Sequence, residues 1–305
     1  MPQEPPPRPS FAPRNWAGWL MVGVLVVLGH LPATLGRWLV TPLGPLLYHA
    51  MGRRRRIAER NIAACFPEFD AGDCAALVRA SFASVARMLL EMAWCWAGGG
   101  RKVLRMGRII GKEHLDRLVE EGHGVLVVTA HFTCLEIGGR LLCEHFSGGA
   151  IYRPLNNIVV EWYQTRGRLR FADVMISKRD IRSAVRYLRK GGHLWYAPDQ
   201  DFGPNQCIFV PFFGIPTATL LATHRLPSLT GCRVIPMFPR YDAATRSYEV
   251  HIMPPIDDFP GEDPAADLGR INAILEAQVR HAPEQYWWIH RRFKTRPEGE
   301  PPFYA

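Results

Sequence analysis

The feature that most limits how this chain can fold is an apolar run over residues 124–130, which reads GVLVVTA and holds no charged side chain. A strand that is apolar at every position, and not only at alternate positions, is typical of a parallel sheet covered by helices on both faces. A helical segment is expected soon after it, over residues 133–145. The run therefore predicts a buried strand in an α/β fold.

The alternation of strands and helices continues along the rest of the chain. Besides the first strand, others are expected near residues 150–153, 174–177, 193–197, 233–238 and 248–253. Further helices are expected near residues 57–70, 73–96, 157–170, 180–190, 217–229 and 264–281. This order predicts a mainly parallel central sheet flanked by helices, because strands joined through helices run parallel. In such sheets, binding sites form at the carboxyl ends of the strands.

The N-terminal part differs in composition from the rest. Residues 1–15 are rich in Pro and Arg, which predicts a disordered N-terminus. Residues 16–36 lack charged side chains and reach the ~20 residues that a membrane-spanning helix needs. The arginines at 53–56 belong on the cytoplasmic side by the positive-inside rule. We therefore expect a membrane-anchoring segment with a hydrophobic helix over residues 16–50, and an α/β domain on the cytoplasmic side over residues 51–305.

Two other interpretations of this segment stay open. One is a cleaved signal peptide with Ala33 near a small-residue cleavage site, although the long apolar run and the unpaired cysteines argue against a secreted protein. The other is a helix that lies in the membrane interface, because His30 and Pro32 interrupt the apolar run. Whether the segment spans the membrane or lies in its interface, the α/β domain is expected at the cytoplasmic face.

The chain carries a formal net charge of +9, from 37 Lys and Arg against 28 Asp and Glu. An anionic membrane surface, an acidic carrier protein or nucleic acid would match such a surface, but the sequence holds no nucleic-acid-binding motif. Its seven cysteines are irregularly spaced and form no CxxC pair, so neither a zinc site nor a disulfide framework is predicted. The unpaired cysteines favour a reducing compartment.

The candidate chemistry begins directly after the strand at residues 124–130. His131 stands at the carboxyl end of this strand, and Glu136 follows five positions later, in HFTCLE. A carboxylate can hold a histidine in one tautomer, so His131 is predicted to be a general base that Glu136 orients. Structural roles compete: His131 as a hydrogen-bonded strand-end residue, and Glu136 as a helix cap together with Thr133. Cys134 fits a small buried residue better than a nucleophile.

Charged residues follow other predicted strands and would reach the same end of the sheet. Arg153 ends the second strand and could bind a phosphate or stabilise an oxyanion. Asp199 and Asp201 lie in APDQD, at the end of the strand HLWYA. Arg166 belongs to an arginine cluster on the helix between the second and third strands. These four are the predicted substrate-binding residues, and solvated strand-end, turn and helix-face roles are the alternatives.

Together these segments resemble the HX4D/E acyltransferases of lipid A assembly, specifically the lauroyl acyltransferase group. The resemblance covers about residues 15–303 and rests on more than the pair of His131 and Glu136. The other matching segments are NIAACFPE at 61–68, WYQTRGRL at 162–169, WYAPDQDFG at 195–203 and EQYWWIHRRFKTRPEG at 284–299. Two positions depart from the family pattern: Gln200, where close relatives often have His, and Cys134, where Thr is common.

The resemblance implies a glycerolipid-acyltransferase-like fold and an enzyme that transfers a secondary, lauroyl-type chain from acyl carrier protein. The implied acceptor is the 3-hydroxyl of a hydroxyacyl chain on Kdo2-lipid IVA. The implied location is the inner membrane, with the catalytic domain on the cytoplasmic face, and no metal or organic cofactor is implied. His131 would be the general base and Glu136 its orienting carboxylate. A basic surface suits both the acidic carrier protein and the phosphorylated lipid.

Three rival functions remain open. The first is a related acyltransferase with another chain length, or with a glycerophospholipid or glycolipid acceptor, although APDQD at residues 197–201 lacks the Pro-Glu-Gly block of the glycerolipid class. The second is a membrane-associated binding protein with a degenerate site, which the intact His131 and Glu136 disfavour. The third is a hydrolase that uses His131 to activate water, and the sequence has no GxSxG nucleophile elbow.

Overall fold

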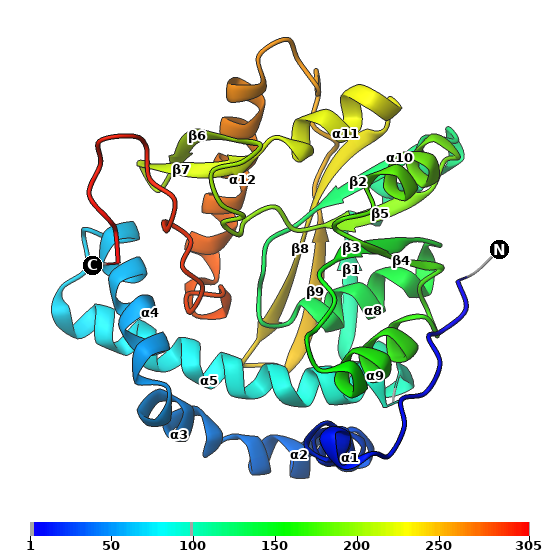
Figure 1. Ribbon diagram of the computed structural model, residues 1–305, viewed down its shortest axis with the longest axis vertical. Coiled ribbons are helices and arrows are strands. Elements are labelled where there is room, and N and C mark those ends of the chain that lie inside the picture. Colours follow the sequence, from blue (N-terminus) through cyan, green and yellow to red (C-terminus); the bar gives the residue numbers. More distant parts are fainter. Residues whose placement is uncertain (1–2, 98–99, 305) are drawn as a thin grey trace.

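A central sheet of seven strands forms the body of the molecule (Figure 1) in the computed structural model, which describes residues 3–97 and 100–304. The strands are β1 (Gly107–Ile110), β2 (Val125–Val128), β3 (Gly149–Tyr152), β4 (Val174–Ser177), β5 (His193–Tyr196), β8 (Arg233–Asp242) and β9 (Ser247–Ile252). Their order is β1-β9-β8-β2-β5-β3-β4, and all neighbours pair in parallel except β8 with β9. A separate antiparallel pair joins β6 (Cys207–Phe212) to β7 (Ile215–Leu220).

Helices flank the sheet, so the predicted mainly parallel sheet with helical cover is confirmed. The helices are α1 (Trp16–His30), α2 (Ala33–Val40), α3 (Leu43–Ala50), α4 (Gly52–Cys65), α5 (Ala71–Trp96), α6 (Gly100–Met106), α7 (Lys112–Glu120), α8 (Leu135–His145), α9 (Ile158–Arg168), α10 (Ile181–Arg189), α11 (Ala222–Thr230) and α12 (Pro264–His281). Helices α1, α3, α4, α8 and α9 pack against α5. In Figure 1, α5 lies between the sheet and the N-terminal helices.

Strand β2 pairs with β8 on one side and with β5 on the other. All four of its residues are buried, which explains why the sequence is apolar at every position of this strand. Burying each such side chain contributes roughly 1.5–3 kcal/mol. In the pairing of β2 with β5, Val128 lies opposite Tyr196. The two strands therefore end at the same height, which sets the geometry of the site.

Helix α5 begins at a capping box. Asp70 Oδ1 accepts a hydrogen bond from the Asp73 amide at 2.8 Å, and the Asp73 carboxylate accepts one from the Asp70 amide at 3.4 Å. The helix therefore starts two residues before the predicted position, because Asp70 is the cap. Its predicted apolar stripe faces the core, where Val78, Phe82 and Val85 are buried.

The apolar N-terminal run is divided into separate helices. Helix α1 ends at His30, because Leu31 adopts an extended backbone ahead of Pro32. Helix α2 begins directly after that proline, at Ala33. Within residues 3–97 and 100–304, no helix combines the length and the apolar character that crossing a membrane requires. The predicted N-terminal membrane-spanning helix is therefore not supported.

The chain ahead of α1 has specific partners. The Gln3 amide donates a hydrogen bond to the Asp173 carbonyl at 2.8 Å, and the Gln3 side chain accepts one from the Met175 amide at 2.7 Å, at strand β4. These contacts differ from the disordered N-terminus predicted for residues 1–15, of which residues 3–15 are described.

The single helix predicted over residues 217–229 is also divided. Its first residues belong to β7, and only the later ones form α11. The turn between β6 and β7 consists of Phe213 and Gly214, with φ of 52° and 72°. Two successive left-handed residues match a type I′ hairpin turn, for which Asn-Gly is the common sequence signal. Phe-Gly does not carry that signal, so the hairpin was not predicted.

Candidate active site

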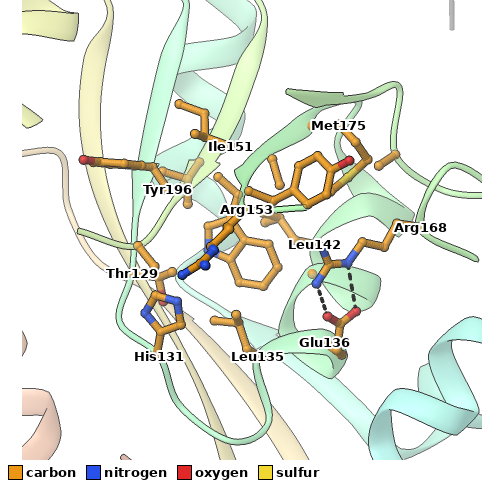
Figure 2. Close-up of a pocket in the computed structure, with 18 of the residues that line it drawn as sticks. Thr129, His131, Leu135, Glu136, Leu142, Ile151, Arg153, Arg168, Met175 and Tyr196 are labelled. Carbon is orange, nitrogen blue, oxygen red and sulfur yellow. Dashed lines mark hydrogen bonds and ion pairs between the residues drawn. The ribbon is translucent and has the colours of Figure 1, made fainter. Parts of the chain in front are cut away.

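A cavity of about 650 Å³ lies at the carboxyl ends of β2, β3 and β5 (Figure 2). The loop after β2 contributes His131, the end of β3 contributes Arg153, and the segment after β5 contributes Gln200. Helices α8 and α9 contribute Glu136 and Arg168. The polar residues of the site thus gather at the edge of the sheet where a doubly covered parallel sheet is expected to bind its ligands.

His131 is held by the carboxylate of Asp199. Its Nδ1 lies 2.6 Å from Asp199 Oδ1, and its backbone amide donates to Asp199 Oδ2 at 2.9 Å. The Asp199 side chain is only 2% exposed, whereas that of His131 is 30% exposed. Burial alone would raise the pKa of Asp199, but the adjoining His131 ring and its hydrogen bonds lower this pKa from 3.8 to about 2. An anionic Asp199 keeps the proton on Nδ1 and leaves Nε2 as the basic nitrogen.

Glu136 has other partners than the predicted one. Its carboxylate accepts a hydrogen bond from Trp96 Nε1 at 2.8 Å and forms an ion pair with Arg168, which Figure 2 shows. In the described structure the predicted pairing of Glu136 with His131 is not formed, and Asp199 orients the ring instead. Glu136 is the second residue of α8, and successive side chains of a helix differ in direction by about 100°. Its side chain therefore points away from the His131 ring.

The predicted helix cap by Thr133 and Glu136 is wrong. Helix α8 begins at Leu135, and Cys134 is the N-cap residue, without a side-chain cap. Thr133 therefore precedes the cap position, and its hydroxyl has no hydrogen-bond partner among the described residues. Cys134 is fully buried, and burial raises the pKa of its thiol. A buried protonated thiol fits the predicted structural role.

The two arginines predicted to bind substrate have different surroundings. Arg153 lines the cavity, and in Figure 2 its guanidinium points toward the His131 ring. Arg166 is exposed, stacks over Trp162 at 5.5 Å and is not among the cavity-lining residues. Arg168 lines the cavity in its place, because two residues along a helix differ in direction by about 200°.

Asp201 organises the C-terminal segment beside the cavity. Its carboxylate accepts hydrogen bonds from the Thr295 amide at 2.6 Å and from the Thr295 hydroxyl at 2.8 Å. Its own amide donates to His290 Nε2 at 3.1 Å, and His290 lines the cavity. Sequence reasoning did not single out His290, although the residue lies in the HRRFKTRPEG segment that carried the resemblance.

The model of one protein family matches residues 8–295 of this chain, and its description is bacterial lipid A biosynthesis acyltransferase. The chain belongs to this family. It is 37% identical to the lipid A biosynthesis lauroyltransferase of Escherichia coli K12, over 96% of each chain. It is also 37% identical to the lipid A biosynthesis palmitoleoyltransferase of the same strain, over 97% of each chain. The predicted family is confirmed, and the protein is an acyltransferase.

One solved structure shows a weaker likeness to this acyltransferase. It is the 1-acyl-sn-glycerophosphate acyltransferase of Thermotoga maritima, with a TM-score of 0.38 and 14% identity. The match covers 81% of this chain and 95% of that one.

The inner part of the acyltransferase cavity is apolar. Its lining there includes Leu115, Val127, Leu142, Phe146, Met175 and Trp195. Gly139 of α8 packs directly on the ring of Trp195, because a Cβ at this position would lie 2.1 Å from the ring. The absence of a side chain at Gly139 thus lets the indole approach the helix closely, beside a cavity lined with hydrocarbon and aromatic groups.

The polar side of the acyltransferase cavity is basic. Lys178 and Lys294 join Arg153 in its lining. The Lys178 ammonium lies 4.4 Å from the centre of the Phe202 ring, and burial together with the neighbouring Arg153 lowers the pKa of this lysine. The cavity therefore combines an apolar interior with cationic groups, as a binding site for an amphipathic anion requires.

Proposed function

We propose that the protein transfers a lauroyl-type chain from acyl carrier protein to the 3-hydroxyl of a hydroxyacyl chain on Kdo2-lipid IVA. The observation that carries this proposal is the position of the His131 ring, oriented by buried Asp199, beside a cavity with an apolar interior. His131 is the proposed general base, and Asp199 takes the orienting role first assigned to Glu136.

The chemistry follows from the free nitrogen of His131, whose Nε2 has no hydrogen-bond partner in the described residues. Nε2 takes the proton of the acceptor hydroxyl as its oxygen attacks the thioester carbonyl. The carbon–sulfur bond then breaks, and the proton passes to the leaving thiolate. General-base catalysis of this kind contributes roughly 10²–10⁴-fold to the rate.

The acyl chain of the donor fits the apolar interior of the cavity. Two relatives of equal identity are named for laurate and for palmitoleate, so family membership alone leaves the chain length undecided. We infer a lauroyl-type chain from the resemblance of the C-terminal HRRFKTRPEG segment. A difference of one methylene shifts pocket binding by only ~1 kcal/mol, so the preference is expected to be graded.

The basic residues of the cavity suit both proposed substrates. Arg153, Lys178 and Lys294 present positive charge beside the proposed base. A phosphorylated lipid and the phosphopantetheine arm of a carrier protein are both anionic, and arginine in particular forms bidentate contacts with phosphate. A net charge of +9 would also steer an acidic carrier protein toward the enzyme.

The N-terminal helices supply the proposed membrane contact. Large apolar side chains of α1 and α2 are exposed, among them Leu20 at 73%, Val27 at 61% and Trp38 at 71%. Exposed apolar surface of this extent marks a binding surface. We propose that residues 16–50 lie in the plane of the inner membrane and hold the catalytic domain, residues 51–305, at its cytoplasmic face.

The test is transfer with defined substrates. Purified protein is incubated with Kdo2-lipid IVA and acyl carrier proteins that bear chains of different length, and the lipid is weighed by mass spectrometry. The expected result is the mass of one added chain, largest in yield for laurate, and its loss in His131→Ala.

A glycerophospholipid acceptor is the comparison. Lysophosphatidic acid replaces Kdo2-lipid IVA in a parallel reaction with the same donors. Acylation of the glycerophospholipid without any added mass on Kdo2-lipid IVA would refute the proposed acceptor and keep the acyltransferase assignment.

A further inference from the structure

Two histidines are held by the same short segment after β5. Asp199 binds the His131 ring through its carboxylate, and two residues later the Asp201 amide binds the His290 ring. Both histidines line the same cavity. The segment therefore fixes the two imidazoles next to one another, but it does so through chemically opposite contacts.

The contact at His290 dictates its tautomer. A backbone amide can only donate, so His290 Nε2 must be the unprotonated acceptor of the bond from Asp201. In a neutral ring the remaining proton then resides on Nδ1. Burial lowers the pKa of His290 to about 4, so the ring is neutral at physiological pH. Nδ1 has no hydrogen-bond partner in the described part of the chain, so its N–H is free to donate.

The backbone around His290 is fixed on two sides. Asn61 of α4 donates from its amide to the Trp288 carbonyl at 2.7 Å and to the His290 carbonyl at 2.8 Å. The Trp287 amide donates to the carbonyl of His131 itself at 3.0 Å. The segment that carries His290 is therefore tied both to α4 and to the residue that bears the proposed base. Such preorganisation is what a donor needs in order to stabilise charge in a transition state.

We propose that His290 is a second catalytic residue, whose Nδ1–H donates a hydrogen bond to the oxyanion formed when the acceptor hydroxyl attacks the thioester. This inference rests on the proposed acyl transfer. The new carbon–oxygen bond places the carbonyl electron pair on oxygen, where His290 stabilises it. When the carbonyl re-forms, the carbon–sulfur bond breaks and the thiolate takes the proton that His131 removed. His290 itself gains and loses no proton.

Arg153 is the other candidate for this role, and its surroundings differ. Its side chain is exposed and directly follows β3, whereas His290 is half-buried and neutral. A solvated guanidinium suits a phosphate of the substrate. An N–H of a ring that the Asp201 contact holds in place suits a charge that exists only in the transition state.

The test uses two variants that separate the two nitrogens of His290. In His290→Gln, the amide group lies near the former Nε2, so its oxygen can still accept the hydrogen bond from Asp201, but no donor remains at Nδ1. In His290→Asn, the amide nitrogen lies near the former Nδ1, so a donor remains, but the bond to Asp201 is lost. Measured quantities are kcat and KM for acyl transfer and the melting temperature of each variant.

The proposal predicts that His290→Gln lowers kcat about 100-fold with KM and melting temperature close to wild type, as loss of one oxyanion donor does. His290→Asn should keep a higher kcat than His290→Gln while melting at a lower temperature. A purely structural His290 reverses this order, because Gln then preserves activity better than Asn. The reversed order, equal losses in both variants or an unchanged kcat in His290→Gln would each overturn the proposal.

The wild-type protein and His131→Ala are measured in the same assays. Absence of wild-type transfer to any lipid acceptor would defeat the proposed function. The two His290 variants are then compared by hydrolysis of the acyl thioester, since water attacking that carbonyl forms the same oxyanion. If the wild-type enzyme transfers acyl chains and His290→Gln has the same kcat, only the proposed role of His290 is refuted, and the proposed function stands.

Discussion

Asp199 is a buried carboxylate, and both of its oxygens bond to His131. In Asp199→Asn, the amide can offer a donor to Nδ1, which favours the tautomer in which Nε2 carries the proton and cannot act as a base. We expect kcat to fall by about 10³–10⁴-fold with little change in KM. Steady-state kinetics would check this, with Glu136→Gln as the matched control. A larger kcat loss in Glu136→Gln than in Asp199→Asn would contradict the assignment.

The same carboxylate should make stability depend on pH in acid. The folded pKa of Asp199 is about 2, below its ordinary value of 3.8, so its ionised form stabilises the folded state. This stabilisation, about 2 kcal/mol, is fully present above pH 4 and is lost as pH falls toward 2. Urea midpoints of wild type and Asp199→Asn should therefore differ most near pH 5 and converge toward pH 2. A constant difference over that range would refute the prediction.

The partner of His131 could not be found from the sequence because it depends on strand order. The sequence predicts both His131 and Asp199 at strand ends, but closeness in sequence favours Glu136 as the partner of His131. In the sheet, Val128 of β2 lies opposite Tyr196 of β5. His131 and Asp199 each follow three positions later, which brings them to the same height. Strands β3 and β4 lie between β2 and β5 in the sequence, yet β2 and β5 are neighbours in the sheet. No local sequence pattern predicts this pairing.

At the scale of elements, the Glu136–Arg168 pair joins α8 to α9. The two side chains are 11% and 17% exposed, so each leaves a mostly buried charge if the other is removed. We expect Glu136→Gln to destabilise the protein by roughly 3 kcal/mol, and Glu136→Gln with Arg168→Met to cost less than the sum of the single changes. Denaturant unfolding of the four proteins would measure this coupling, and additive losses would disprove it.

The packing of α8 on Trp195 offers a second test. In Gly139→Ala, the new Cβ would lie 2.1 Å from the Trp195 ring, which must move toward the cavity. We expect a loss of about 1–3 kcal/mol in stability and a shift toward shorter acyl chains. Gly269→Ala on α12 is the control, because nothing lies within 4 Å of its Cβ, and it should stabilise by about 0.5–1 kcal/mol. Equal stability changes at both glycines would show the packing argument to be wrong.

Helices and strands were predicted correctly where a single sequence signal was strong. They were predicted poorly where two signals conflicted or the signal was weak. Strand β2 was predicted because its sequence is apolar at every position, and α5 because apolar residues recur at helical spacing from Val78 to Met92. The run over residues 16–36 was read as one helix from its hydrophobicity, yet Pro32 divides it. In β6 and β7 the strands depend on a turn of Phe213 and Gly214, whose local sequence signal is weak.

At the scale of the whole molecule, α1 and α2 lie on the outside of the fold (Figure 1), and several of their large apolar side chains are exposed. If this face binds membrane, charge placed on it should abolish membrane binding without harming the fold. Leu20→Asp with Val27→Asp is expected to reduce binding to anionic vesicles at least about a hundredfold, because each exposed apolar side chain contributes roughly 1.5 kcal/mol or more when it is buried in lipid. Vesicle co-sedimentation would measure the change.

The control for this surface is a single aspartate in place of an exposed apolar residue on another element. Leu229 of α11 is 52% exposed, so Leu229→Asp changes the net charge without altering α1 or α2. It should lose only about fivefold in vesicle binding, since one added negative charge weakens attraction to an anionic surface by ~1 kcal/mol. Both proteins should turn over a detergent-solubilised acceptor at wild-type rates. If the double variant binds vesicles as tightly as wild type, α1 and α2 do not form the membrane contact. The basic surface of the protein would then account for membrane binding.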